Sequence, residues 1–343
     1  MIIIDGSRGE GGGQIMRTAL ALSAILGKPV RIYNIRKNRP QPGLKPQHLE
    51  SVRAIAKIAD AKLEGDHLHS TELTFIPRSL NCGNYVFSVK TAGSITLIIQ
   101  TIFPALALCG GYSRVILEGG TDVPFSPLSD YMRLIFLPTL EKMGIKSRMR
   151  ILRRGHYPRG GGRVELEVWG SNSLNPIRQE HFGKLLKLDG ISFCTNLPEH
   201  VAERQAKSAC RTLSRLNVPC EIERKVYKAL DRGSGIVVRG ISTSGAIAGA
   251  DAPGKPGKRA EVVGREAARR MLEIVEMDCG VDVHMGDMLL PYMALTTGKS
   301  IISTCRLTGH IETNMWVVHE MTGVLFQVRG RSPVRIEVEG ITV

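Results

Sequence analysis

The sequence predicts an α/β (α+β) protein in which a βαβαββ unit occurs three times and a smaller α/β domain is inserted. Two observations predict this fold. A helical pattern ends at a glycine and a strand pattern follows it directly at three places, Gly27, Gly111 and Gly298. The third copy also starts late, because about a hundred residues with their own strand and helix pattern separate it from the second copy.

The first unit is expected to span residues 2–77. Its strand, helix, strand and second helix are expected at residues 2–4, 19–26, 30–35 and 48–59. Two further strands complete the unit. The first helix is expected to end at Gly27, since glycine is the residue that most often follows the last helical turn.

The second and third units repeat this order. In the second unit, the strand, helix, strand, helix and last strand are expected at residues 85–89, 95–107, 114–118, 130–143 and 162–168. In the third unit, the same elements are expected at residues 281–284, 288–295, 301–306, 312–322 and 334–338. Each unit then presents two helices on one face of a small sheet, so the three units can share one core between their helices.

The intervening residues 182–277 predict a separate inserted α/β domain, which leaves residues 1–181 and 278–343 as the domain of the three repeats. Helices are expected at residues 200–216 and 259–275, and strands at residues 188–194, 220–223 and 235–239. The last two strands are expected to pair with each other. The glycine- and proline-rich residues 249–257 predict a flexible loop.

The charge of the chain favours a polyanionic partner. The formal net charge is +14, and residues 145–163 contain seven basic side chains and no acidic one. Basic side chains that neutralise phosphates release condensed counterions, which drives binding to nucleic acids. Clustered charge of this kind produces a surface field, whereas scattered charge mainly aids solubility.

The cysteines and the apolar segments suggest the compartment. The seven cysteines are dispersed and form no Cys-x-x-Cys pair, so we expect neither a zinc site nor a disulfide framework, and most thiols are expected to be buried. The first residues lack the pattern of a secretory signal peptide, and the apolar residues 95–109 are too few to span a bilayer. We therefore expect a cytoplasmic protein without a membrane partner.

The most informative motif is the glycine-rich turn of residues 8–17, which lies between the first strand and the first helix. Glycine lets the backbone approach an oxyanion, and the start of a helix offers free N–H groups to it. Glu10 lies inside this turn, and a carboxylate beside a phosphate is repulsive unless a cation separates them. We therefore expect a divalent metal at Glu10, with Arg8 and Arg17 on either side. The alternative is a tight turn without a ligand.

A second motif surrounds His310, which follows a predicted strand and Gly309 at the start of a helix. A neutral imidazole can attack a phosphoryl centre directly, and the amides at a helix start stabilise the charge that develops. Thr313 or Asn314 is expected to cap this helix or to hold a nitrogen of the imidazole. The alternative is a polar surface histidine.

Other polar residues extend the candidate site. The loop of residues 36–48 projects Arg36, Arg39 and Gln47, and guanidinium groups suit phosphates, although a solvated basic loop is the alternative. Gln100 lies inside an apolar helix and needs either a core partner or a ligand. Asp287 precedes a predicted helix, and helix capping alone would explain it.

These motifs together resemble the RNA 3′-terminal phosphate cyclase family over essentially the whole chain. The resemblance rests on five motifs in order, Gly9-Glu-Gly-Gly-Gly-Gln-Ile-Met-Arg17, residues 36–48, Glu118-Gly-Gly-Thr121, Tyr157-Pro-Arg-Gly-Gly-Gly162 and Gly309-His-Ile-Glu-Thr-Asn314. It implies repeats like the C-terminal domain of translation initiation factor 3 and an inserted thioredoxin-like domain.

The resemblance also implies the chemistry. His310 would attack the α-phosphate of ATP, the AMP would pass to an RNA 3′-terminal phosphate, and the adjacent 2′-OH would displace AMP to close a 2′,3′-cyclic phosphate. Glu10 would bind Mg²⁺ or Mn²⁺. The residues expected to contact nucleotide or RNA are Arg17, Arg36, Arg39, Gln47, Gln100, Pro127, His284, Met285, Gly286, Asp287 and Met288. Many relatives have Tyr and Gln where this chain has His284 and Met288, which leaves the adenine contacts at these two positions open.

Two other functions are alternatives to the cyclase hypothesis. One is a cyclase-like factor of ribosome biogenesis without catalytic activity, which would have no nucleophilic histidine. The other is a carboxyvinyl-transferring synthase, which has related repeats but no use for a nucleophilic His310 or a basic surface. The sequence leaves open whether the protein is a monomer or a homodimer.

Overall fold

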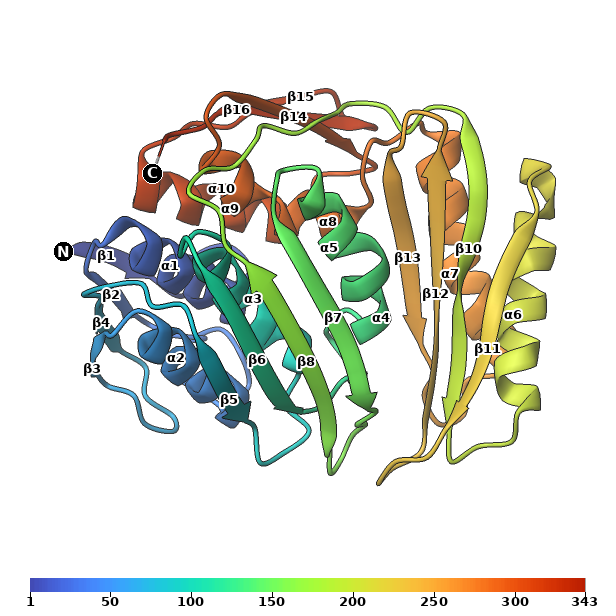
Figure 1. Ribbon diagram of the computed structural model, residues 1–343, viewed down its shortest axis with the longest axis horizontal. Coiled ribbons are helices and arrows are strands. Elements are labelled where there is room, and N and C mark those ends of the chain that lie inside the picture. The colour runs from blue at the N-terminus through green and yellow to red at the C-terminus, as the bar shows by residue number, and fades with distance from the viewer. Residues whose placement is uncertain (343) are drawn as a thin grey trace.

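The computed structural model describes residues 1–342, and Figure 1 shows three units around a shared set of helices with a fourth unit at one side. The chain forms four separate four-stranded sheets. Three of these sheets have the same strand order and the same directions. In each, the first strand pairs with the second in parallel, and the second and third strands both pair with the fourth in antiparallel. The mixed α/β class and the threefold repeat are therefore confirmed, whereas the likeness to translation initiation factor 3 stays a prediction.

The first unit follows the expected order closely. Its elements are β1 (Ile2–Asp5), α1 (Gly13–Leu26), β2 (Val30–Tyr33), α2 (Pro46–Ile58), β3 (Lys62–Glu64) and β4 (Leu73–Ile76). α1 ends at Gly27, whose φ of 65° is the left-handed conformation that favours glycine.

The second unit contains the long apolar helix. Its elements are β5 (Asn84–Ser88), α3 (Ile95–Ala107), β6 (Tyr112–Gly119), α4 (Ser129–Tyr131), the π-helix η1 (Met132–Phe136), α5 (Leu137–Glu141), β7 (Lys146–Arg153) and β8 (Gly162–Trp169). Ser94 caps α3 by accepting a hydrogen bond from the N–H of Leu97. The helix expected at residues 130–143 is observed as one continuous helical segment over residues 129–141, with a π-helical turn at its centre.

The third unit is interrupted after its first strand. Its elements are β9 (Arg178–Gln179), α8 (Val283–Met288), α9 (Leu290–Ala294), β14 (Lys299–Thr304), α10 (Gly309–Thr322), β15 (Gln327–Arg329) and β16 (Val334–Glu339). The strand expected at residues 281–284 is wrong, because these residues lead into α8. The first strand of the unit is instead β9, which pairs in parallel with β14 ahead of the insertion.

The insertion forms the fourth sheet, with two helices on one face (Figure 1). Its elements are β10 (Leu185–Thr195), α6 (His200–Leu213), the 3₁₀ helix η2 (Ser214–Leu216), β11 (Cys220–Tyr227), β12 (Gly233–Ser242), β13 (Ile247–Pro253) and α7 (Ala260–Glu276). The expected pairing of β11 with β12 is wrong, since both flank β10. The loop expected at residues 249–257 is also wrong in its first half, which is the buried strand β13 paired with β12. The domain boundaries stay predictions.

The helices of the three units pack together to form the main core. α1 contacts both α3 and α10, and α2 contacts α3. Their inward side chains are apolar and fully buried, as at Leu20, Ile99 and Val317. This arrangement places the start of α1 beside the start of α10, although the two helices lie at opposite ends of the sequence.

The expectation about disulfides is wrong. The structure contains Cys82–Cys109 and Cys210–Cys220 disulfides, with Cα–Cα distances of 5.8 and 5.4 Å, which lie in the usual range. The spacing in the sequence gave no sign of them, because folding alone brings the end of α3 beside the start of β5, and α6 beside β11. The remaining three cysteines are buried as expected.

No helix among residues 1–342 combines the length and apolar character needed to cross a membrane.

Candidate active site

The glycine turn and the His310 segment meet at the starts of α1 and α10. α10 begins at Gly309, after Thr308, whose hydroxyl caps the helix. The N–H of Glu10 donates a hydrogen bond to Thr313 Oγ1 at 3.1 Å, which ties the turn to α10. His310 is exposed at this junction, so its imidazole is open to a ligand.

One imidazole nitrogen of His310 is held by Gln14. The carboxamide oxygen of Gln14 contacts His310 Nδ1, and the carboxamide nitrogen donates to the Asp287 carboxylate. An ionised carboxylate can only accept hydrogen bonds, so Asp287 turns the amide nitrogen toward itself and the amide oxygen toward the imidazole. In the neutral imidazole, this contact places the proton on Nδ1 and the lone pair on Nε2. The free Nε2 is the atom that can act as a nucleophile.

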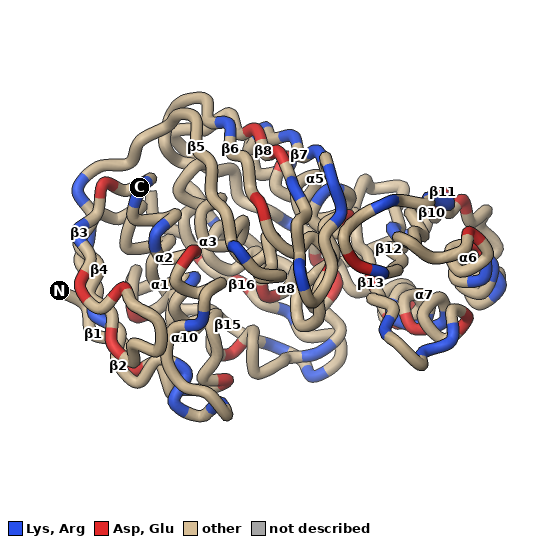
Figure 2. The backbone as a smooth tube through the Cα atoms, turned by 90° about the horizontal axis from the view of Figure 1, so that it is seen from below, with Lys and Arg blue, Asp and Glu red and all other residues tan. Residues whose placement is uncertain are grey.

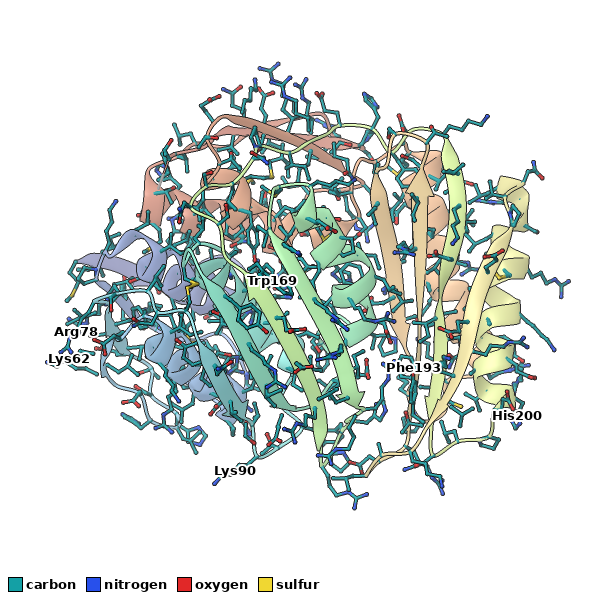
Figure 3. All side chains as sticks on the ribbon, in the orientation of Figure 1. Lys62, Arg78, Lys90, Trp169, Phe193 and His200 are labelled. Carbon is teal, nitrogen blue, oxygen red and sulfur yellow. A yellow bond between two sulfur atoms is a disulfide. The ribbon has the colours of Figure 1, made fainter. Side chains whose placement is uncertain are left out.

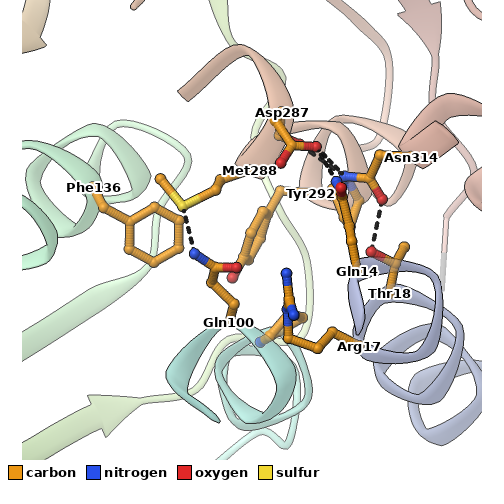
Figure 4. A pocket seen from close by; sticks show the side chains of 11 residues that line it. Gln14, Arg17, Thr18, Gln100, Phe136, Asp287, Met288, Tyr292 and Asn314 are labelled. Atoms are coloured by element: carbon orange, nitrogen blue, oxygen red, sulfur yellow. Dashed lines mark hydrogen bonds between the residues drawn. The ribbon is translucent and has the colours of Figure 1, made fainter. Parts of the chain in front are cut away.

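Asp287 is the centre of a small polar network (Figure 4). Asn314 Nδ2 donates to its carboxylate at 3.0 Å, and Asn314 in turn accepts a hydrogen bond of 2.6 Å from the Thr18 hydroxyl. Burial raises the pKa of Asp287, while the positive charge of Arg17 and hydrogen bonds from Gln14 and Asn314 oppose that rise. The network links α1, α8 and α10 and so fixes the position of Gln14.

The cap expected for α10 is wrong, because Thr308 caps this helix rather than Thr313 or Asn314. Helix capping, the alternative explanation for Asp287, does not apply, because Asp287 lies inside α8, which Asp282 caps by accepting hydrogen bonds from two backbone N–H groups. α8 starts at Val283, ahead of the helix expected from residue 288.

Three cationic or donor side chains converge on the glycines at the start of α1. A methyl group on Gly12 would lie 3.2 Å from the Arg39 guanidinium, and one on Gly13 would lie 3.2 Å from Arg17 and 2.6 Å from His48. Burial lowers the pKa of Arg17 to about 10, so the guanidinium still carries its charge at neutral pH. No side chain caps the start of α1. Its free N–H groups and these side chains together form an anion cradle.

His48 is a member of this cradle that sequence analysis did not assign. Burial lowers the pKa of His48 to about 3, with further lowering from the positive charges of Arg36, Arg17 and Lys45. The imidazole is therefore neutral. Its Nδ1 accepts a hydrogen bond from the backbone N–H of Lys45 at 3.2 Å, so Nε2 carries the proton and can donate it to an anion. No feature of the sequence distinguishes this histidine from a surface one.

Arg36 and Gln47 hold loops in place. Arg36 donates to the carbonyls of Gln41 and Gly43, both at 2.8 Å, and so closes its own loop. Gln47 Oε1 accepts a hydrogen bond from the N–H of Ser94 at 2.8 Å, which fixes the segment that leads into α3. The polar contacts of these two side chains are therefore with the backbone, whereas Arg17 and Arg39 lie against Gly13 and Gly12.

Glu10 faces an open cavity of about 600 Å³. The cavity is lined by Arg8, Gly9, Glu10, Asn38, Arg39, Gly309, Glu312, Thr313 and Trp316. The carboxylate of Glu10 lies 3.4 Å from Arg39 Nη2 and beside Gly309, where a methyl group would approach Glu10 Oε1 to 2.7 Å. Among residues 1–342, no three His, Cys, Asp or Glu side chains gather in a metal-binding cluster.

A narrow cavity lies between α1, α3 and α8 (Figure 4). Its volume of about 30 Å³ is close to that of one water molecule. Gln100 Nε2 lies 3.1 Å from the sulfur of Met288, and both residues line the cavity. Phe136 and Tyr292 supply aromatic walls. A cavity of this volume is too small for a nucleotide base.

The remaining predicted nucleotide residues lie apart from this cavity. His284 is exposed, with Nε2 3.7 Å from the Asp251 carboxylate of the insertion. Met285 is fully buried in the core, and Gly286 packs against Thr304. The carbonyl of Pro127 accepts a hydrogen bond from the Thr96 hydroxyl at 3.0 Å. Of residues 284–288, only Asp287 and Met288 line the cavity.

Ion pairs offset part of the positive charge of residues 145–163, in two cases with the neighbouring strand β8. Arg150 forms an ion pair with Glu165 on β8, and Arg114 on β6 pairs with the same carboxylate from the other side. Arg148 lies 4.0 Å from Glu167. Figure 2 shows acidic residues on β8 beside the basic residues of β7. Clustering in the sequence therefore overstated the surface charge here, because the acidic partners lie on a different strand.

Comparisons with known proteins agree with the resemblance read from the motifs. The family model for RNA 3′-terminal phosphate cyclase matches residues 8–328. A protein of that name from Pyrobaculum aerophilum is 45% identical over 340 residues, 98% of each chain. Proteins of the same name from Pyrococcus abyssi and Hyperthermus butylicus are 48% and 50% identical, covering 96% and 93% of this chain and 96% and 90% of their own.

Among solved structures, the enolpyruvyl transferase NikO from Streptomyces tendae matches 99% of this chain and 48% of its own chain, with 12% identity and a TM-score of 0.40. A likeness at this level does not bear on function.

Proposed function

Because the chain belongs to the RNA 3′-terminal phosphate cyclase family, we propose that it converts the 3′-terminal phosphate of an RNA to a 2′,3′-cyclic phosphodiester and consumes ATP. One structural observation supports the proposal independently of family membership. Gln14, oriented by Asp287, holds the proton on Nδ1 of His310 and leaves Nε2 free at an exposed position. This is the state that a histidine nucleophile needs.

The first step uses that nitrogen. His310 Nε2 attacks the α-phosphate of ATP, an N–P bond forms, and the bond to the pyrophosphate oxygen breaks. The imidazole becomes positively charged, and Gln14 Oε1 stabilises the Nδ1–H that shares this charge. Arg17, Arg39 and the neutral His48 donate hydrogen bonds to phosphate oxygens at the start of α1.

The second and third steps transfer and release the AMP. An oxygen of the RNA 3′-phosphate attacks the adenylate phosphorus, and the N–P bond breaks with the electron pair returning to Nε2. The neighbouring 2′-OH then attacks the activated phosphate, its proton passes to solvent, and AMP leaves. Ring closure is fast because the hydroxyl is already adjacent to the phosphorus.

Glu10 would hold a divalent cation beside the phosphates of ATP. Mg²⁺ and Mn²⁺ prefer oxygen ligands, and Mg²⁺ usually takes only one or two carboxylates beside phosphate and water. Glu10 is half-exposed, lies beside the first turn of α10 and faces an open cavity. A bound cation would neutralise charge on the phosphates and on the leaving pyrophosphate.

The test is incubation with ATP labelled at the α-phosphate in the presence of Mg²⁺. We expect label on the protein that acid removes and base preserves, and none on His310→Ala; His319→Ala is the matched control, since His319 lies on the same helix away from the site. The competing functions predict differently. A non-catalytic biogenesis factor and a carboxyvinyl-transferring synthase would both leave the wild-type protein unlabelled, and label that survives His310→Ala would contradict the proposed nucleophile.

A further inference from the structure

Trp316 forms an aromatic wall of the open cavity that Glu10 faces. It lies on α10 beyond His310, about 9 Å farther along the helix axis at a rise of about 1.5 Å per residue. Residues three, four and seven positions apart share one face of a helix. Four residues of α10 at this spacing line the cavity: Gly309, Glu312, Thr313 and Trp316. The face of α10 that begins beside the proposed nucleophile therefore leads to an indole ring.

Two neighbours hold the Trp316 ring in place. Its Nε1–H donates a hydrogen bond of 2.8 Å to the Glu320 carboxylate, and the central carbon of the Arg8 guanidinium lies 4.4 Å from the ring centroid. A planar guanidinium stacks favourably on an aromatic face. Both Arg8 and Trp316 line the cavity and keep part of their surface open to solvent. The Arg8–Trp316 pair is therefore an oriented and accessible platform for another planar group.

The charges around this cavity favour a neutral occupant. Its lining contains two basic and two acidic side chains: Arg8, Arg39, Glu10 and Glu312. The formal charges cancel, in contrast to the anion cradle at the start of α1, which suits phosphates. The volume of about 600 Å³ lies within the usual range for small-molecule sites. A nucleobase has the required properties, because it is planar, uncharged and polar at its edges.

The position of the cavity suits the end of the RNA rather than the base of ATP. In the proposed reaction, the RNA 3′-phosphate must reach the adenylate on His310 Nε2, so the terminal base lies one ribose away from that phosphate. The narrow cavity behind Gln14 is too small for a base, at about 30 Å³. The residues predicted to contact adenine, Pro127 and residues 284–288, do not line the cavity beside Trp316.

We propose that the base of the terminal RNA nucleotide stacks on the Arg8–Trp316 pair and that this contact positions the 3′-phosphate beside His310. Unpaired RNA bases are commonly bound by stacking on aromatic rings or on Arg guanidinium planes. Such stacking tolerates any base, because every base has a π face. This inference rests on the proposed cyclisation, since it states how that substrate's end is held.

The experiment measures RNA binding directly, by fluorescence anisotropy without ATP. Two labelled single strands that end in a 3′-phosphate are compared, one intact and one whose terminal nucleotide lacks its base. The proteins are wild type, Trp316→Ala, Trp316→Phe and Trp169→Ala. Trp169, labelled in Figure 3, is a matched control, because it is the other tryptophan of the chain and also has a cation over its ring, Lys146 Nζ at 5.1 Å.

We expect wild type and Trp169→Ala to bind the intact end about tenfold more tightly than the end without a base, which is typical of one stacked base. Trp316→Ala should bind both RNAs equally, and Trp316→Phe should keep most of the preference. The preference compares two RNAs on one protein, so a general loss of affinity in a variant cancels. A wild type without preference, or a tenfold preference that persists in Trp316→Ala, would overturn the proposal.

Tryptophan fluorescence gives a second measurement on variants that keep an aromatic ring. Trp169→Phe leaves Trp316 as the single tryptophan of the chain, and Trp316→Phe leaves Trp169. The intact RNA should quench the fluorescence of Trp169→Phe and leave that of Trp316→Phe unchanged. Absence of quenching would overturn the proposal. Equal quenching by AMP alone would also overturn it, because the platform would then hold the adenine of ATP.

Labelling of wild-type His310 by ATP separates this inference from the proposed function. A base-dependent affinity without labelling would contradict the proposed function and leave the stacking site in place. Normal labelling with an affinity that ignores the terminal base would contradict the stacking site alone.

Discussion

Gln14 and His310 are 296 positions apart in the sequence, and the carboxamide oxygen of Gln14 contacts Nδ1 of His310. The contact exists because α1 packs along α10, and its direction is set by Asp287 on α8, which accepts the hydrogen bond from the carboxamide nitrogen. The three units contribute differently to the site. The first and third units supply this hydrogen-bond network, and the second unit supplies Gln100 to the cavity beside it.

Replacement of Gln14 tests whether this contact controls the nucleophile. We expect Gln14→Ala to slow adenylylation of His310 by about 10- to 100-fold, the usual effect of removing a residue that orients a functional histidine. Nitrogen NMR of the imidazole should show a loss of the Nδ1–H tautomer. Gln327→Ala, an exposed glutamine on β15, is the control and should label normally. Wild-type labelling by Gln14→Ala would exclude an orienting role.

Replacement of Glu10 tests the metal assignment. We expect Glu10→Gln to raise the Mg²⁺ concentration needed for half-maximal adenylylation by about tenfold, because a neutral amide is a poorer ligand for a hard cation. Labelling should recover in part at high Mg²⁺ or with Mn²⁺. Glu64→Gln, on an exposed strand of the same unit, should leave the metal dependence unchanged. If Glu10→Gln and wild type have the same metal titration, the carboxylate is not a ligand.

The sequence alone was enough to predict the threefold repeat and those site residues that lie in a recognisable local motif. The glycine joints marked three units, and the residues around Glu10 and His310 formed motifs because a glycine turn or a helix start must be encoded locally. β9 was missed because its two residues are too short to show periodicity. β13 was missed because Gly249, Asp251 and Pro253 are uncommon in strands, and the strand forms through its pairing with β12 and its burial in the folded chain.

Contacts across long sequence separations could not be predicted from local patterns. Gln14 belongs to the glycine-rich motif of residues 8–17, yet its role depends on Asp287 and His310, which lie on other helices. The partner of Arg150, Glu165, lies on the adjacent strand, so the basic stretch appeared unpaired in the sequence. The two disulfides have the same origin, because each joins cysteines that only the folded chain brings together.

The neutral state of His48 should make stability depend on pH. Its pKa in the folded protein is about 3, against an ordinary value near 6.5, so the unfolded chain binds an extra proton between these values. Stability from this residue is therefore complete above about pH 6.5 and is lost as the pH falls toward 3. His48→Gln, which cannot take up this proton, should show a shallower loss of unfolding free energy in that window, measured by urea titration. His67→Gln, an exposed histidine, should follow wild type, and identical curves for all three proteins would mean that His48 is not desolvated.

The Glu165 carboxylate should stabilise the sheet of the second unit through its two arginines. Hydrogen bonds from Arg114 and Arg150 lower the pKa of Glu165, so its contribution is present above its ordinary pKa of 4.5 and is lost as the pH falls below that value. We expect Glu165→Gln to lower the free energy of unfolding by about 1 to 3 kcal/mol at pH 7, because it weakens two charge-assisted hydrogen bonds to a buried group. The difference from wild type should shrink in acid, where wild-type Glu165 is also neutral. Glu339→Gln, at an exposed strand end, is the control and should change stability by less than about 0.5 kcal/mol. A Glu165→Gln deficit that persists unchanged at pH 3 would show that packing, rather than charge, accounts for the effect.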